Sequence, residues 1–105
     1  MDSLSLLQGI FQAQEMQEKI TDLQSDLEQR EFSASVGGGA VEIKINGKRE
    51  VLSLNIKPEV VDPEDVEMLQ DLIMSAFNEA VHNLDEVSDK EMSELTGGVS
   101  FPGLF

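Results

Sequence analysis

The first part of the chain has the hydrophobic period of a helix. Apolar residues recur at steps of three and four from Leu6 to Leu27, which predicts one long amphipathic helix. Such a helix is roughly 30 Å long, more than a sheet of short strands is expected to cover. We therefore expect its apolar seam to pack in a homodimer, although the same seam also suits a foreign helix. The predicted dimer-interface residues are Ile10, Met16, Ile20, Leu23 and Leu27.

The middle of the chain changes to an alternation of apolar and polar residues, which predicts strands. Gly37-Gly38-Gly39 reads as a flexible connection between the first two strands, and Asn46-Gly47 suits a two-residue type I′ turn before the third. The strands are therefore expected to be antiparallel, with Leu54 among the residues that face the core. They cover residues 32–36, 41–45 and 52–56.

A second long helix follows the strands. Asp62 is the expected N-cap and Pro63 the expected first helical residue. A regular apolar stripe runs from Val66 to Val87, and Gly97-Gly98 is expected to end the helix. The predicted fold is α+β, with a long N-terminal helix, a three-stranded antiparallel sheet and a long C-terminal helix. Residues 1–96 are expected to form a single domain and residues 97–105 a flexible tail.

Charge is distributed unevenly along the chain. The formal net charge is -14, which disfavours contact with nucleic acid over most of the surface. Residues 37–57 differ, because four basic and two acidic side chains give them a net charge of +2. The basic residues of this segment are Lys44, Lys48, Arg49 and Lys57. Taken alone, they suit phosphate binding and the protection of a sheet edge against aggregation equally well.

Other classes of function find little support in the sequence. With no cysteine and a single histidine, His82, in a helical pattern, no nucleophilic or metal site is expected. The acids around Asp62 match no calcium loop and suit a helix start. We therefore expect no enzyme activity, cofactor, metal or small-molecule substrate. No signal peptide or membrane span is recognised either, so we expect a cytoplasmic protein with no membrane partner.

Several segments together resemble the YbaB/EbfC family of nucleoid-associated DNA-binding proteins across nearly the whole chain. Each segment alone is weak evidence for this resemblance, but the order and spacing of all of them together are specific to the family. They are Ala13-Gln14-x-Met16-Gln17-Glu18-Lys19, Gly37-Gly38-Gly39-x-Val41 with Asn46-Gly47, Ile56-x-Pro58, and Glu67-Met68-Leu69-Gln70-Asp71-Leu72-Ile73 with Ala76-Phe77-Asn78-Glu79-Ala80.

This resemblance implies a homodimer in the nucleoid that binds duplex DNA with limited sequence preference and affects nucleoid organisation or gene expression. We expect contacts to phosphate rather than to base edges. The predicted DNA-binding residues are Lys44, Lys48, Arg49 and Lys57, with Lys19 and Arg30 adding to them. The alternative function is an acidic protein-interaction module that contacts basic partners without binding DNA.

Overall fold

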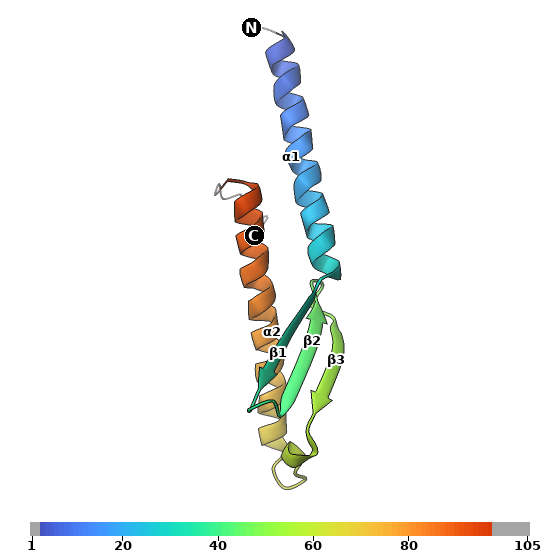
Figure 1. Cartoon of the computed structure of the whole chain (residues 1–105), viewed down its shortest axis with the longest axis vertical. Helices are drawn as coiled ribbons and strands as arrows, with labels where there is room; N and C mark the ends of the chain where they lie inside the picture. Colours follow the sequence, from blue (N-terminus) through green and yellow to red (C-terminus); the bar gives the residue numbers. More distant parts are fainter. Residues whose placement is uncertain (1–2, 98–105) are drawn as a thin grey trace.

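The computed structural model describes residues 3–97, and the side chains of residues 14–97 (Figure 1). The chain folds as helix, three strands and helix, which confirms the predicted α+β order. The predicted tail lies almost wholly outside the described residues. The elements are α1 (Ser3–Gln29), β1 (Glu31–Val36), β2 (Val41–Asn46), β3 (Val51–Ile56), the short 3-10 helix η1 (Pro58–Val60) and α2 (Val66–Leu95).

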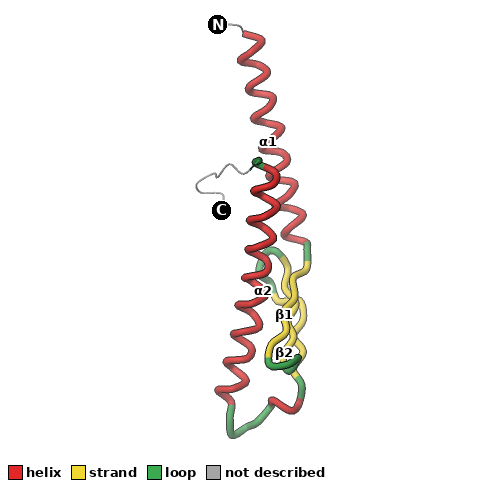
Figure 2. Tube along the Cα trace, turned by 60° about the vertical axis from the view of Figure 1, so that its left-hand side comes forward, coloured by secondary structure: helices red, strands yellow, loops and turns green. Residues whose placement is uncertain are grey.

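The molecule is elongated. Its extents are 75 × 20 × 18 Å and its radius of gyration is 20.2 Å, against about 13 Å for a compact domain of this length. Figures 1 and 2 show the reason: α1 and α2 run antiparallel beside each other, and the first half of α1 projects past the end of α2. Among residues 3–97, much of α1 therefore has no neighbouring element.

The core lies between α2 and one face of the sheet. The strands are antiparallel in the order β1-β2-β3, and Ile45 of β2 pairs with Phe32 of β1. Ile45 and Val41 are fully buried, as are Ala76 and Ala80 on α2. Alanine at these two positions lets the helix backbone approach the strands. Each large apolar side chain buried between them contributes about 1.5–3 kcal/mol to the stability of the fold.

β3 is the strand that α2 leaves uncovered. The helix packs against β1 and β2, so Val51 and Leu54 are 51% and 41% exposed. Leu54 pairs with Ile43 and therefore faces the same side of the sheet as the core, as predicted, but nothing among the described residues buries it. The pairing shifts register after Lys44, which makes Leu52 the extra residue of a β-bulge.

The predicted type I′ turn at Asn46-Gly47 is wrong. The backbone of Arg49, rather than that of Asn46 or Gly47, has positive φ, at 66°. The Arg49 N–H donates to the Asn46 carbonyl oxygen at 3.0 Å, so the connection is a three-residue loop that ends in a left-handed residue. The Asn46 side chain stabilises it by accepting from the backbone N–H groups of Lys48 and Glu50.

Gly47 has a different role in this loop. A Cβ built on it would lie 1.9 Å from the Leu27 carbonyl oxygen, so glycine is required by the close approach of the loop to the end of α1. Positive φ occurs instead in the β1–β2 connection, where Gly37, Gly38 and Gly39 all have left-handed backbones.

The predicted start of α2 is also wrong. Asp65 is the N-cap, and its carboxylate accepts from the Met68 N–H at 3.3 Å, so the helix begins at Val66. Asp62 instead accepts from the Glu64 N–H at 2.9 Å and stabilises the turn that precedes the helix. At the other end, α2 stops at Leu95 and Gly97 has φ +67°, which confirms the predicted glycine stop.

Candidate nucleic-acid interface

Lys44 lies in the middle of the sheet face that points away from α2. It pairs with Ser33 on β1 and with Ser53 on β3. Its ammonium nitrogen is 3.5 Å from a carboxylate oxygen of Glu31, and both side chains are about half exposed. An exposed ion pair of this kind contributes at most about 1 kcal/mol, so Lys44 is accessible to an incoming anion.

The other three cations of the middle segment lie at the two ends of the sheet. Lys48 and Arg49 are in the β2–β3 loop, whereas Lys57 follows β3 and its N–H donates to the Ala40 carbonyl oxygen at the opposite end of β2. The length of β2 separates them, about 20 Å for six residues. The middle segment therefore presents a line of cations along the sheet and not a compact cluster.

Arg49 differs from its neighbours because it has an acidic partner. Its guanidinium nitrogen is 2.8 Å from a carboxylate oxygen of Asp85 on α2. Within the described part of the chain, Lys48 and Lys57 form no ion pair, and both are exposed. Of the four cations of residues 37–57, these two lysines and Lys44 are the ones most available to phosphate.

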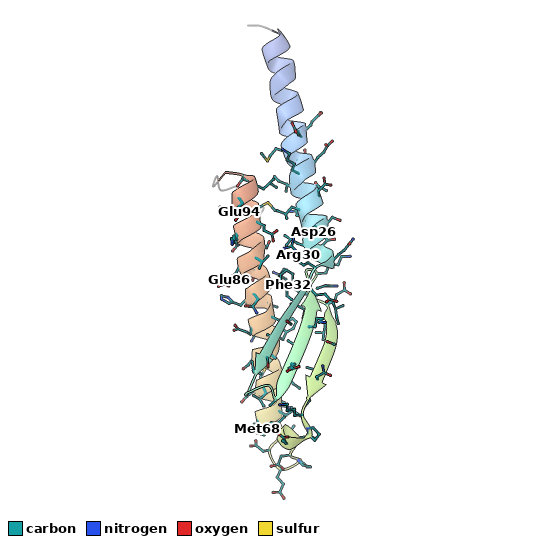
Figure 3. All side chains as sticks on the ribbon, viewed as in Figure 1. Asp26, Arg30, Phe32, Met68, Glu86 and Glu94 are labelled. Carbon is teal, nitrogen blue, oxygen red and sulfur yellow. The ribbon has the colours of Figure 1, made fainter. Side chains whose placement is uncertain are left out.

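Arg30 joins the two helices. Its guanidinium donates to both carboxylate oxygens of Glu91 on α2 and to Asp26 on α1, and Figure 3 shows it at the end of α1 between the helices. Hydrogen bonds to Glu91 and then to Asp26 raise the pKa of Arg30 further above its ordinary value. Two carboxylates therefore offset its charge.

Lys19 is the sixth predicted cation. Its ammonium is 3.7 Å from the carboxylate of Glu15 one turn earlier on α1. Such an exposed pair is weak, so Lys19 remains accessible on the projecting helix, far from the sheet.

The predicted dimer seam is covered in part by its own chain. Leu27 belongs to the core, with 5% exposure, and Leu23 packs against that core. Met16 and Ile20 are half-buried, and Ile10 lies outside the residues whose side chains the structure describes. The stretch of seam around Met16 and Ile20 is therefore the part that a second chain could still contact.

A second apolar surface was not predicted from the sequence. The uncovered face of β3 and the adjoining side of α2 form a groove of about 390 Å³. Met74, at its rim, is 55% exposed. The only signal of this groove in the sequence is two apolar residues at unexpected positions. Val51 lies outside the expected third strand, and Met74 lies outside the apolar stripe of the second helix. The groove is lined by Ile43, Val51, Leu54, Ile73, Met74, Phe77 and Asn78.

The described residues show no metal site and no membrane span that would support another class of function. His82 pairs with Glu86 on the exposed side of α2, at 3.0 Å. No group of histidine and acidic side chains among the described residues has the geometry of a metal site. Neither described helix contains an apolar stretch of the length that a membrane span requires.

Comparison with known proteins gives consistent matches. The model of the YbaB/EbfC DNA-binding family matches residues 5–99. The chain is 57% identical over 94 residues to a nucleoid-associated protein of Clostridium novyi, covering 90% of this chain and 82% of that protein. It is 55% identical over 95 residues to a nucleoid-associated protein of Clostridium acetobutylicum, covering 90% and 85%.

The fold also matches a solved structure. The crystal structure of an uncharacterized protein from Helicobacter pylori superposes with a TM-score of 0.69 at 26% identity, covering 91% of this chain and 98% of that one. The fold, the family match over nearly the whole chain and the high identity to relatives agree. The chain belongs to the YbaB/EbfC DNA-binding family.

Proposed function

We propose that this protein binds duplex DNA as a homodimer in the nucleoid, through phosphate contacts with limited sequence preference, and thereby affects nucleoid organisation or gene expression. Membership of a DNA-binding family carries this proposal, and relatives more than half identical are named nucleoid-associated proteins. The same membership confirms that the chain is not an enzyme.

The proposed contacts follow the only segment with a positive net charge. Lys44, Lys48 and Lys57 are exposed or weakly paired, whereas Arg49 must leave Asp85 to reach a phosphate. Lys19 and Arg30 are proposed as secondary contacts. Because the rest of the chain is acidic, we expect weak binding that depends strongly on salt.

A salt titration of duplex DNA tests this proposal. If all four cations of residues 37–57 in both subunits met phosphates, log K against log salt would slope by about -7, and by about -5 if Arg49 stayed with Asp85. Replacing Lys48 and Lys57 by glutamine should flatten the slope by about 4 in a dimer. Lys90→Gln is the matched control, since Lys90 is an exposed lysine on acidic α2, and it should leave the slope unchanged.

One observation favours the alternative function. Several acidic residues on α2 are exposed, among them Glu86 and Glu94 (Figure 3), and a surface of this charge suits a basic protein partner. Absence of DNA binding even at about 50 mM salt, where phosphate attraction is strong, would favour this acidic interaction module and contradict DNA binding.

The homodimer is proposed from the two apolar surfaces that one chain leaves open. Val51, Leu54 and Met74 expose a groove without a charged residue. An anionic chain can approach its own copy most easily where neither surface carries charge, and one patch can serve both subunits about a two-fold axis. Met16 and Ile20 on α1 are proposed to extend this interface.

Sedimentation at micromolar concentration tests the dimer. Combining Leu54→Ser with Met74→Ser should yield a folded monomer, because these side chains lie at the groove rather than in the core. Combining Met16→Ser with Ile20→Ser should weaken the dimer less. A monomeric wild-type chain would refute the dimer, and a groove variant that stays dimeric would exclude the groove as its interface.

A further inference from the structure

We infer that the sheet face opposite α2 is a phosphate-contact surface in which Ser33 and Ser53 bind the same phosphate as Lys44. This inference rests on the proposed DNA binding and adds uncharged contacts to it. It assigns a role to strand residues that composition and net charge do not single out.

The strand register places the three side chains in one row. Ser33 of β1 pairs with Lys44, and Lys44 pairs with Ser53 of β3. Directly paired residues have Cβ atoms about 4.5–5.5 Å apart and point to the same face. One ammonium group therefore lies between two hydroxyl groups, and all three can donate to the oxygens of a single phosphate.

The row is open to a large ligand. Core residues occupy the other face of the sheet, against α2. The outer face contains a shallow hollow of about 530 Å³, to which Ser33, Lys44 and Ser53 all contribute. Ser33 and Ser53 are exposed, and no side chain described in the structure donates to either hydroxyl. A phosphate could approach this row without a change in the backbone.

The residue types on this face suit the close approach of a phosphate better than they suit a strand that contacts only solvent. Exposed strand positions favour residues such as threonine and tyrosine, and asparagine is depleted there. This face instead has Ser33, Ser35, Ser53 and Asn55. Short side chains leave the lysine unshielded, and serine and asparagine are common partners of DNA phosphates beside lysine.

Two carboxylates limit the affinity of this surface. Glu31 pairs with Lys44 at 3.5 Å in an exposed ion pair that a phosphate can replace at small cost. Glu42 lies in the neighbouring row, between Ser35 and Asn55, and repels an anion there. The favoured phosphate position is therefore the Ser33–Lys44–Ser53 row itself.

The salt dependence of DNA binding distinguishes the serines from the lysine. Combining Ser33→Ala with Ser53→Ala removes hydrogen bonds but no charge, so we expect affinity to fall about two- to tenfold with an unchanged salt slope. Lys44→Gln should also flatten the slope, by about 2 for a dimer. The pair Ser75→Ala and Ser93→Ala, on exposed positions of α2, is the matched control and should bind like the wild type.

A second variant guards against loss of folding. Combining Ser33→Thr with Ser53→Thr keeps both hydroxyls and favours strands, so this variant should retain binding where the alanine variant loses it. Wild-type affinity in the alanine variant, or loss in the threonine variant with its fold intact by circular dichroism, would overturn the inference. If only Lys44→Gln weakened binding, the proposed function would stand and this inference would fail. Absence of wild-type binding would remove both.

Discussion

Replacing Gly47 by alanine should weaken the attachment of α1 to the sheet. The new Cβ would lie 1.9 Å from the Leu27 carbonyl oxygen and 2.8 Å from the Cα of Glu28. Both neighbours belong to the backbone, so no side-chain rotation can relieve the contact. The β2–β3 loop and the end of α1 must therefore move apart by more than 1 Å, a distance that follows from ordinary contacts of about 3.5 Å.

This movement disturbs a buried part of the core. Leu27 is 5% exposed at the same junction, so separating the loop from α1 opens its packing. Overpacked sites typically lose about 1–3 kcal/mol, and a clash with backbone lies at the upper end, so we expect about 3 kcal/mol. Gly47 has no positive φ, so steric conflict alone accounts for the loss.

Gly38→Ala is the matched control for this variant. Gly38 has φ +66°, but nothing lies within 4 Å of its Cβ position, so only backbone strain of about 1–2 kcal/mol is expected. Urea unfolding followed by circular dichroism measures both variants, at one protein concentration because the proposed dimerisation would add stability. Our explanation of Gly47 would be refuted if alanine there destabilised the protein no more than alanine at position 38.

Two further predictions concern the helix ends. Arg30→Ala removes the hydrogen bonds to Glu91 on α2 and to Asp26 on α1. Since the Arg30 side chain is 36% exposed, we expect a loss of stability of only about 1 kcal/mol. Thermal melts should show that loss shrinking in high salt, and a loss independent of salt would contradict an electrostatic origin. Asp65→Ala should destabilise α2 by about 1 kcal/mol, measured by urea unfolding. Asp62→Ala should cost less, because Asp62 does not cap the helix, and the reverse order would contradict the assignment of the cap.

The regular elements were predictable because their apolar residues repeat with the period of the backbone. The stripe from Leu6 to Leu27 and the three alternating segments correspond to α1 and the strands within a few residues. The type of the β2–β3 loop and the N-cap of α2 were not predictable, because more than one residue or loop type suits each position. Asp62 and Asp65 are both good N-caps, and Asn46-Gly47 fits two kinds of hairpin loop. Only tertiary contacts, such as that of Gly47 with α1, decide between them.

The basic residues of the candidate site could be predicted from the sequence, but their ion-pair partners could not. Counting charges along the chain identified residues 37–57 as the basic segment, and the register then placed Lys44 on the outer face. That Asp85 on α2 would lie against Arg49 depends on the crossing of helix and sheet, which no local pattern encodes. The same is true of the groove beside β3, which exists because α2 packs mainly against β1 and β2.

The ion pair between Arg49 and Asp85 leads to a prediction about how an acidic protein limits its own affinity for DNA. An exposed pair of this kind is worth up to about 1 kcal/mol, and Arg49 must give it up to bind phosphate. Asp85→Asn should therefore raise DNA affinity by up to about fivefold per subunit, since 1.4 kcal/mol corresponds to tenfold, and the gain should shrink in high salt.

Net charge alone could also raise affinity, and Asp89→Asn separates the two causes. Asp89 is exposed one turn further along α2, and its removal changes the total charge equally without touching the described partner of Arg49. Fluorescence anisotropy with duplex DNA at low salt should show the larger gain for Asp85→Asn. Equal gains would mean that the field of the whole acidic surface, and not competition for Arg49, sets the affinity. Adding Asp85→Asn to an Arg49→Gln variant decides the point, because the gain measured relative to Arg49→Gln alone should contain only the part due to net charge.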